Sequence, residues 1–310
     1  MTAPLTHALE PRYYTDPEIF RLEQEGLLSR TWQFAGHRSQ IPNPGDYFTL
    51  EIAEQSLFCV RGRDRKIRAF YNVCQHRAHE LVSGSGSARL LVCPYHQWAY
   101  DLTGQLKGGP NVTKVPGFDM STICLTEVRL EDFLVYLFVN LDYEAAPMDD
   151  WYPGVREELG EFVPHIEALA PLEWVEIPET CNWKLSVENY SECYHCPSNH
   201  QTFATGVIKP ETYDIQPDPI GGYVLRHVTE CQSMERMTYP IVLDDVIRGL
   251  AVQDRDTTVA EDIRLVESVS RGLRSRGYKP GPLVLDPSCG VMSEHSIARL
   301  HQWIREAVNG

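Results

Sequence analysis

The chain has 310 residues, and its 43 acidic and 28 basic side chains give it a formal net charge of −15 and a pI near 5.2. This surplus of negative charge argues against nucleic acids and anionic membrane surfaces as partners. The sequence contains no apolar run of about 18 residues or more, so it predicts no transmembrane helix.

The N-terminus and the cysteine count bear on the compartment. Residues 1–7 lack the basic start and the apolar core of a secretory signal peptide. The nine cysteines are an odd number, and two of them stand in metal-ligand spacing. We therefore expect reduced thiols and a cytoplasmic location.

The first half of the chain predicts a lead-in helix followed by an antiparallel sheet. Residues 15–33 carry apolar side chains in a loosely helical pattern. Strand-like runs separated by polar and Gly-containing turns then follow at 47–50, 57–60, 67–71, 123–128 and 133–140. We expect the sheet to form a domain over residues 45–142, preceded by the lead-in 1–44 and followed by a Pro- and Asp-rich linker at 142–153.

Two short arms of metal-ligating residues interrupt this sheet. The first arm carries Cys74 and His76, and the second carries Cys93 and His96. A structural zinc site is the plain alternative, but zinc fingers usually put both cysteines in one arm and both histidines in the other. One cysteine and one histidine in each arm are typical of a Rieske 2Fe–2S cluster, in which two histidines replace two cysteines on one iron. The spacing therefore favours a Rieske cluster.

A second group of candidate ligands follows a predicted helix over residues 184–196, which we expect to stop near Pro197. His195 and His200 are five residues apart, and the bend at Pro197 would bring them together. Two histidines and a distant carboxylate form the facial triad of non-haem Fe(II) oxygenases, which leaves coordination positions open. The alternative is a pair of hydrogen-bonded histidines at a helix end.

The carboxylate of this triad has several candidates downstream. A helix predicted over residues 261–269 carries two of them at its start, where a solvated acidic first turn is the alternative reading. The full set of candidates is Asp244, Asp245, Asp254, Asp256, Glu261, Asp262 and Glu267.

The sequence resembles the Rieske non-haem iron oxygenases in several stretches. The first comprises Arg77, directly after a metal-arm histidine, and the run CPYHQWAYDLTG at 93–104. The second is NWKLSVENYSECYHCPSNH at 182–200. The runs at 261–269 and 272–278 resemble the helix that carries the carboxylate ligand in this family, and its continuation.

This resemblance implies an α+β fold. An antiparallel-β Rieske domain at 45–142 would be joined to a catalytic domain at 143–310, built from helices and an antiparallel sheet in a helix-grip-like arrangement. The lead-in 1–44 would belong to the catalytic domain.

The resemblance also implies roles for individual residues. Glu192 would link to a Rieske histidine of the neighbouring protomer in a head-to-tail homotrimer or a multiple of one, with a solvated helix-face glutamate as the alternative. The implied ligands are Cys74, His76, Cys93 and His96 for the 2Fe–2S cluster and His195, His200 and Asp262 for the mononuclear Fe(II), with Asn189 close to that iron.

The chain departs from the family pattern in one interval. Only 61 residues separate His200 from Asp262. They offer about three strands, at 213–215, 223–231 and 237–242, where the family has a broad sheet. We therefore expect a shortened catalytic domain that lacks a block of sequence around residues 240–246.

The predicted function is an oxygenase component that uses O2 to hydroxylate a small molecule. Because the sequence has no dinucleotide fingerprint, NADH or NADPH would act only through a separate flavin/iron–sulfur reductase. The runs at 74–81 and 189–196 look most like the carnitine, choline, glycine betaine and proline betaine branch, which implies demethylation or C–N cleavage of a quaternary ammonium compound. The alternatives are an aromatic ring-hydroxylating dioxygenase alpha subunit and a Rieske electron-transfer protein with an incomplete catalytic site.

Overall fold

The structure, a computed structural model, describes residues 5–171, 173–206, 208–217, 225–230, 255–286 and 292–309. The chain forms two compact units. Unit 1 contains residues 1–23 and 172–310, and unit 2 contains residues 24–171. No helix among the described residues is both long and apolar enough to cross a membrane.

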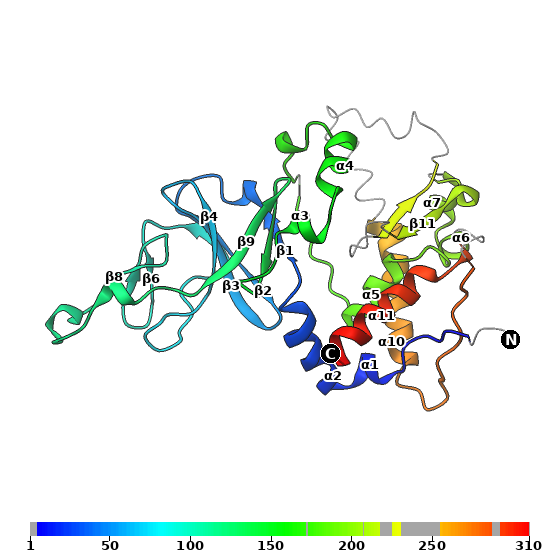
Figure 1. The fold of residues 1–310 in the computed structure, drawn as a ribbon, viewed down its shortest axis with the longest axis horizontal. Coiled ribbons are helices and arrows are strands. Elements are labelled where there is room, and N and C mark those ends of the chain that lie inside the picture. Colours follow the sequence, from blue (N-terminus) through cyan, green and yellow to red (C-terminus); the bar gives the residue numbers. More distant parts are fainter. Residues whose placement is uncertain are drawn as a thin grey trace. The chain divides into compact units, whose positions relative to one another are not determined.

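Unit 2 is built on a seven-stranded sheet with the order β1-β10-β9-β4-β3-β2-β5, and each pair of neighbours is antiparallel (Figure 1). Its strands are β1 Gln33–His37, β2 Asp46–Ile52, β3 Gln55–Arg61, β4 Ile67–Tyr71, β5 Ser85–Ser87, β9 Glu127–Phe133 and β10 Tyr136–Asn140. A π-helical turn at Gln24–Leu28 leads into it.

Alternating side chains give this sheet a core on each face. Along β3, Phe58 and Val60 face one hydrophobic cluster, whereas Leu57 and Cys59 face the other. All four side chains are fully buried. The strand runs predicted from the sequence are therefore confirmed for β2, β3 and β4: β4 has the predicted bounds, and β2 and β3 extend one or two residues further at each end.

The last predicted strand run needs a correction. The run 133–140 is not one strand, because Leu134 and Val135 form a two-residue turn between β9 and β10. Both residues have positive φ angles, 52° and 79°, which are unfavourable for branched side chains. Their side chains are buried in a hydrophobic cluster with Trp32 and Met148, and this burial offsets the backbone cost.

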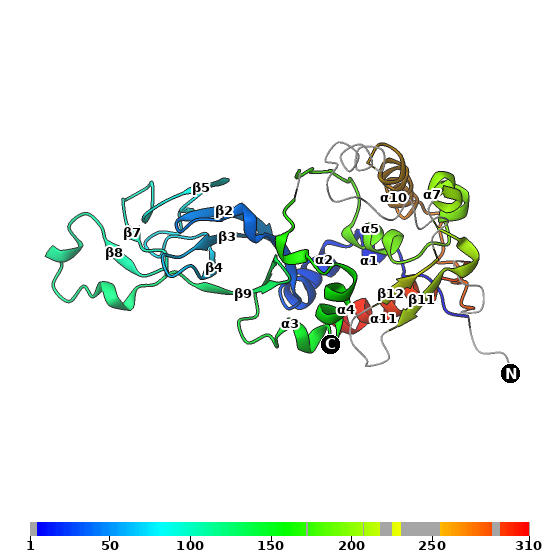
Figure 2. The ribbon, with the colours of Figure 1, turned by 90° about the horizontal axis from the view of Figure 1, so that it is seen from above.

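A smaller sheet with the order β6-β7-β8 carries the metal arms. Its strands are β6 Leu91–Val92, β7 Ala99–Tyr100 and β8 Leu106–Gly108. Within unit 2 it lies at the end away from the helices α3 Met148–Trp151 and α4 Val155–Phe162 (Figure 2).

Unit 2 extends beyond the predicted sheet domain in both directions. On the N-terminal side, β1 pairs with β10. On the C-terminal side, Ile166 packs with Trp32 in one hydrophobic cluster. Residues 24–44 and 143–171 therefore belong to this compact unit. The boundaries 1–44, 45–142 and 143–310 stay a proposal about functional domains.

Unit 1 is mainly helical. Its described elements are α1 Arg12–Thr15, α2 Pro17–Glu23, α5 Trp183–Tyr190, α6 Cys196–Asn199, α7 Gln201–Gly206, β11 Asp214–Pro217, β12 Leu225–Val228, α10 Ala260–Gly272 and α11 His295–Asn309. Helix α5 packs beside α10, and β11 pairs with β12 in an antiparallel ribbon (Figure 1). Ile297 and Ile304 bury the inner face of α11.

A buried ion pair ties the lead-in to the start of α5. The Lys184 ammonium donates to both carboxylate oxygens of Glu23 at 2.7 Å, and neither side chain is exposed. The indole N–H of Trp183 donates to Glu23 at 3.0 Å. This pair anchors helix α5, which leads to the turn that carries the candidate iron ligand His195.

Three predictions for unit 1 differ from the structure or fall outside it. The predicted helix 184–196 ends at Tyr190, and Pro197 stands in the first turn of α6, where a missing N–H costs nothing. The sequence of residues 172–177 also looks strand-like, but residues 173–177 form no strand. The strand expected at 237–242 and the break at 240–246 lie outside the described residues.

Candidate metal centres

The two cysteine–histidine arms have the same local geometry. The Ala78 N–H donates to the Cys74 carbonyl at 3.0 Å, and the Gln97 N–H donates to the Cys93 carbonyl at 2.9 Å. Ala78 and Gln97 both have positive φ angles, 57° and 60°. Each turn therefore places one cysteine and one histidine in the same way, as a cluster held from two sides requires.

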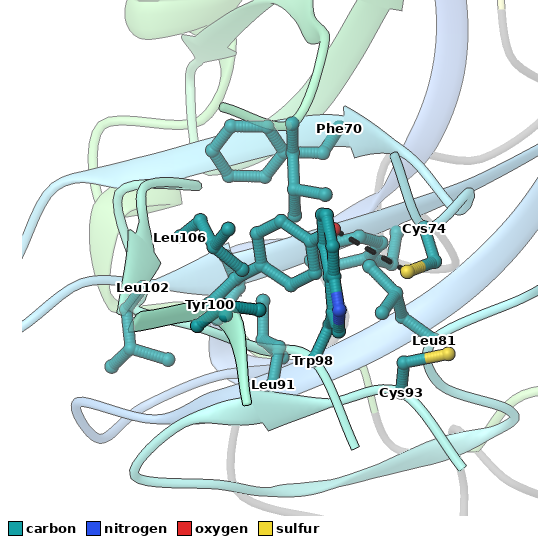
Figure 3. Packing of buried hydrophobic residues seen from close by; sticks show 13 residues of the cluster. Phe70, Cys74, Leu81, Leu91, Cys93, Trp98, Tyr100, Leu102 and Leu106 are labelled. Atoms are coloured by element: carbon teal, nitrogen blue, oxygen red, sulfur yellow. Dashed lines mark hydrogen bonds between the residues drawn. The ribbon is translucent and has the colours of Figure 1, made fainter. Parts of the chain in front are cut away.

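The cysteines of these arms are buried, whereas the histidines are more exposed. Cys74 and Cys93 are 2% exposed and unpaired, and Figure 3 shows both sulfur atoms at the same edge of the hydrophobic cluster. Burial raises the pKa of the Cys74 thiol. The rings of His76 and His96 lie 4.7 Å apart at the outer side, and His76 stacks on Trp98 at 4.6 Å. The donor set fits a 2Fe–2S cluster with thiolates inward and imidazoles outward.

Tyr100 contacts a candidate cluster ligand directly. Its oxygen accepts the Gln75 N–H at 3.1 Å and lies 3.3 Å from the Cys74 sulfur (Figure 3). Once Cys74 is a cluster-bound thiolate, the phenol O–H would be the donor to this sulfur. A hydrogen bond to a ligand sulfur stabilises the more negative, reduced cluster.

Replacing Tyr100 with phenylalanine is therefore expected to lower the cluster's reduction potential by on the order of 50 mV, the value of one weak hydrogen bond. A potentiometric titration followed by electron paramagnetic resonance measures the shift. Tyr143→Phe, at an exposed position of the same unit, is the matched control. An unchanged potential in Tyr100→Phe would contradict the assigned hydrogen bond.

The second candidate centre lies in unit 1, where α6 and α10 meet. The Nε2 atoms of His195 and His200 are 3.1 Å apart, and Asp262 Oδ1 lies 3.3 Å from the first and 2.9 Å from the second. Ligands on one face of an octahedral ion, with bonds of about 2.1 Å, lie about 3.0 Å apart. The three donor atoms thus fit one metal ion.

Carboxylates hold the outer nitrogens of both histidines. Glu192 Oε1 lies 2.5 Å from His195 Nδ1, and Glu261 Oε2 lies 2.8 Å from His200 Nδ1. Each contact orients its histidine so that the Nε2 lone pair points toward the metal position between the three donor atoms, as in other metal centres. The Asn189 amide hydrogen-bonds Asp262.

The structure distinguishes among the carboxylates that the sequence left as candidates for the third iron ligand. Asp262 faces both histidines, and Glu261 serves as the partner of His200, a role that the sequence did not predict. Asp256 pairs with Arg255, and Glu267 accepts from Thr180. Asp244, Asp245 and Asp254 lie outside the described residues.

The charges around His195 in the metal-free site predict that metal binding releases a proton from this histidine. Burial acts to lower the pKa of His195, but Asp262 and Glu192 outweigh it and raise this pKa to about 9. His195 is therefore protonated at neutral pH and must lose its proton to bind a metal. Divalent-ion affinity should rise about tenfold per pH unit up to about pH 9 and then level off.

Calorimetry in buffers of different ionisation enthalpy measures this release, with about one proton expected per ion at pH 7.5. Glu192→Gln removes one of the two carboxylates and should reduce the release. An affinity that does not depend on pH between about 7 and 9 would contradict the predicted charge state.

One disulfide departs from the expectation of reduced thiols. Cys193 and Cys196 are bonded to each other, because the turn between α5 and α6 brings their Cα atoms to 4.9 Å. The prediction of reduced thiols is therefore wrong for this pair. The other cysteines among the described residues are free.

The second centre opens onto a cavity of about 790 Å³. Besides the three candidate ligands, its lining includes the aromatic side chains of Phe203, Tyr213 and Trp303. Iron held there would supply the site that activates dioxygen, and the chain's own residues would hold the substrate beside it.

Comparisons with known proteins agree with both centres. Residues 31–119 match the Rieske [2Fe-2S] domain, and residues 166–240 and 244–310 match the catalytic domain of ring-hydroxylating alpha subunits. The chain belongs to the Rieske non-haem iron oxygenases, as a catalytic alpha subunit whose cofactors are a 2Fe–2S cluster and a mononuclear iron. Within that family it matches the quaternary-ammonium branch.

The relatives in that branch are similar over most of the chain. The carnitine monooxygenase oxygenase subunit of Escherichia coli (strain K12) is 33% identical, with 95% of this chain and 92% of the relative covered. The glycine betaine monooxygenase oxygenase subunit of Chromohalobacter salexigens is 34% identical over 69% of this chain and 47% of its own length.

A solved quaternary ammonium Rieske monooxygenase, whose structure reveals insights into carnitine oxidation by gut microbiota and inter-subunit electron transfer, is also similar. It is 27% identical, with a TM-score of 0.85 over 98% of this chain and 96% of that chain. The α+β fold is thereby confirmed.

The shortened catalytic domain is also supported. The alignment with the Escherichia coli relative runs over 344 positions, more than the 310 residues of this chain, so the relative carries residues that this chain lacks. The match to the catalytic domain is interrupted between residues 240 and 244. The expected break at 240–246 coincides with this interruption.

Proposed function

We propose that this chain is the oxygenase component of a system that hydroxylates a small quaternary ammonium compound at a carbon next to nitrogen. Hydroxylation of an N-methyl group would release formaldehyde, and hydroxylation of another such carbon would cleave the C–N bond differently. The observation that carries the proposal is the full-length similarity to a carnitine monooxygenase subunit.

The cavity beside the candidate iron ligands suits such a substrate. Aromatic faces attract quaternary ammonium groups, and Phe203, Tyr213 and Trp303 supply such faces. These aromatic faces are what favours a cation over the uncharged arene of the ring-hydroxylation alternative.

Oxygen uptake with a chemically defined panel, in the presence of NADH and a flavin/iron–sulfur reductase as electron donor, tests the proposal. Choline, glycine betaine and L-carnitine are compared with naphthalene and benzoate, and 3,3-dimethylbutan-1-ol serves as the uncharged isostere of choline. Uptake with a quaternary ammonium compound, and formaldehyde or an amine as product, is expected. Uptake only with the arenes would instead support a ring-hydroxylating dioxygenase.

The third alternative, an electron-transfer protein without a working catalytic site, predicts no substrate-dependent uptake at all. The three donor atoms within 3.3 Å of one another argue against it, because a site that had lost its function would have no reason to keep this spacing.

The oxygenase requires electrons from outside the chain. We infer that a flavin/iron–sulfur reductase, fed by NADH or NADPH, delivers them to the cluster held by Cys74, His76, Cys93 and His96. A head-to-tail homotrimer, or a multiple of one, would place one protomer's cluster beside the next protomer's iron, and the inter-subunit electron transfer of the solved relative supports this. Sedimentation analysis measures the oligomeric state. The cytoplasmic location stays part of this proposal.

Glu192 is proposed to link the two centres across that boundary. Glu192→Gln is expected to slow cluster oxidation by O2 and substrate about 10–100-fold, the usual cost of losing an outer partner of a metal ligand. Stopped-flow absorbance of the cluster measures the rate, and iron analysis separates slow electron transfer from loss of iron. A wild-type rate at full iron content would contradict the role.

A further inference from the structure

Cys193 and Cys196 flank the candidate iron ligand His195 in sequence. Their side chains are 4% and 5% exposed, and they form the disulfide between α5 and α6. Both line the same cavity as His195 and His200. A redox-active pair therefore lies inside the site that is proposed to bind iron.

Cys196 lies within reach of the metal position. Its sulfur is 4.0 Å from His195 Nε2, and the ligand atoms of His195, Cys196 and His200 all lie within 4.8 Å of one another. Around a tetrahedral zinc, with bonds of about 2.1 Å to nitrogen and about 2.3 Å to sulfur, ligand atoms lie about 3.4–3.6 Å apart. A modest movement of one side chain would bring the Cys196 sulfur to that spacing.

The redox state of Cys196 decides what this ligand set prefers. A disulfide sulfur carries no charge and is a poor ligand, which leaves two imidazoles and the Asp262 carboxylate with open positions, a set that suits Fe(II). A free thiolate would add a soft fourth ligand to His195, His200 and Asp262. Such a closed set suits tetrahedral zinc, which also binds more tightly than Fe(II) in the general order of divalent metals.

We propose that the Cys193–Cys196 disulfide withholds a thiolate from the candidate iron site, and that its reduction creates a zinc site formed by His195, Cys196, His200 and Asp262. The inference rests on the proposed function, since it takes His195 and His200 as the iron ligands. The disulfide thereby gains a role in metal selection. With the cysteine pair oxidised, the site binds iron and keeps open coordination positions; with the pair reduced, it binds zinc with no open position.

The redox step balances with reagents of known class. Reduction by a phosphine and water converts the disulfide to two thiols and the phosphine to its oxide. In the reverse direction, the two thiols give two electrons and two protons to dioxygen, the co-substrate of the oxygenase, and hydrogen peroxide is formed.

Zinc-edge X-ray absorption tests the inference on the full chain with its Rieske cluster in place. The cluster contains no zinc, so the spectrum reports only the second site. The mononuclear metal is removed, and one equivalent of zinc is added anaerobically with or without a water-soluble phosphine, which avoids thiol reagents that bind zinc themselves. We expect one sulfur at about 2.3 Å after reduction, and only nitrogen and oxygen at about 2.0–2.2 Å without it.

Three variants sharpen the result. Cys193→Ser leaves Cys196 permanently unpaired and should show the zinc–sulfur distance without any reductant. Cys196→Ser should show nitrogen and oxygen alone in both conditions. Cys181→Ser removes a half-buried free thiol before α5 and should behave like the wild type. Competition between zinc and Fe(II) should shift toward zinc by about tenfold or more on reduction in the wild type and in Cys181→Ser, and should not shift in Cys193→Ser or Cys196→Ser.

The outcomes separate the two claims. A shell of nitrogen and oxygen alone in the reduced wild type and in Cys193→Ser would overturn the role of the disulfide, while the His195–His200 site would stand. Failure of zinc to bind in either redox state would overturn both the inference and the proposed iron site.

Discussion

Replacing His200 with alanine is expected to reduce the iron content from about three to about two atoms per chain and to leave the acid-labile sulfide at about two. His200 is 3% exposed, and its Nε2 lies within 3.1 Å of both His195 Nε2 and Asp262 Oδ1, so its loss removes one of the three donor atoms of the candidate iron site. Substrate-dependent oxygen uptake should fall by about 1,000-fold or more.

The matched control for this variant is His165→Ala, an exposed histidine of unit 2. It should keep the iron, the sulfide and the oxygen uptake of the wild type. The cluster's visible spectrum should remain in both variants, because neither histidine is a candidate cluster ligand and His200 lies in the other unit. Full iron content in His200→Ala would mean that the mononuclear iron is held elsewhere.

Replacing Lys184 with methionine is expected to destabilise the α2–α5 region by about 3–5 kcal/mol. The variant leaves the Glu23 carboxylate buried without its cation, and no part of either side chain reaches solvent in the native structure. Helix α5 leads directly to the turn that carries His195, so metal retention should weaken as well.

Hydrogen exchange of peptides covering α2 and α5 measures this effect, and protection should fall by about two to four orders of magnitude. Lys209→Met, which removes an exposed ion pair with Glu230, should cost no more than about 1 kcal/mol. The double variant Glu23→Gln with Lys184→Met should recover much of the protection because it removes both charges. Equal protection in Lys184→Met and Lys209→Met would contradict the importance of the buried pair.

Most of the candidate cluster ligands were predicted from the spacing of cysteines and histidines along the chain. The cluster arms depend on residues within one turn of each other, so Cys74, His76, Cys93 and His96 could be proposed as ligands without any knowledge of the packing. The spacing of His195 and His200 is less specific, and they became candidates through the neighbouring Rieske arms and the family resemblance. Asp262 required the family resemblance, because seven carboxylates downstream had equal chemistry and only tertiary structure distinguishes them.

Tertiary contacts explain what the sequence did not predict. The role of Glu261 depends on where α10 meets α6, and no spacing rule relates it to His200. The disulfide depends on the end of α5 at Tyr190, whereas the sequence predicted a continuous helix to Cys196. The turn at Leu134 and Val135 was hidden because apolar residues occupy positions that usually carry Gly or Asn.

Iron, acid-labile sulfide and zinc per chain, measured on anaerobically purified wild-type protein, test the central claim most directly. The account predicts about three irons and two sulfides, which is one Rieske cluster and one mononuclear iron. Two irons with two sulfides would leave the second site without its metal. Zinc without sulfide would contradict the oxygenase assignment as a whole.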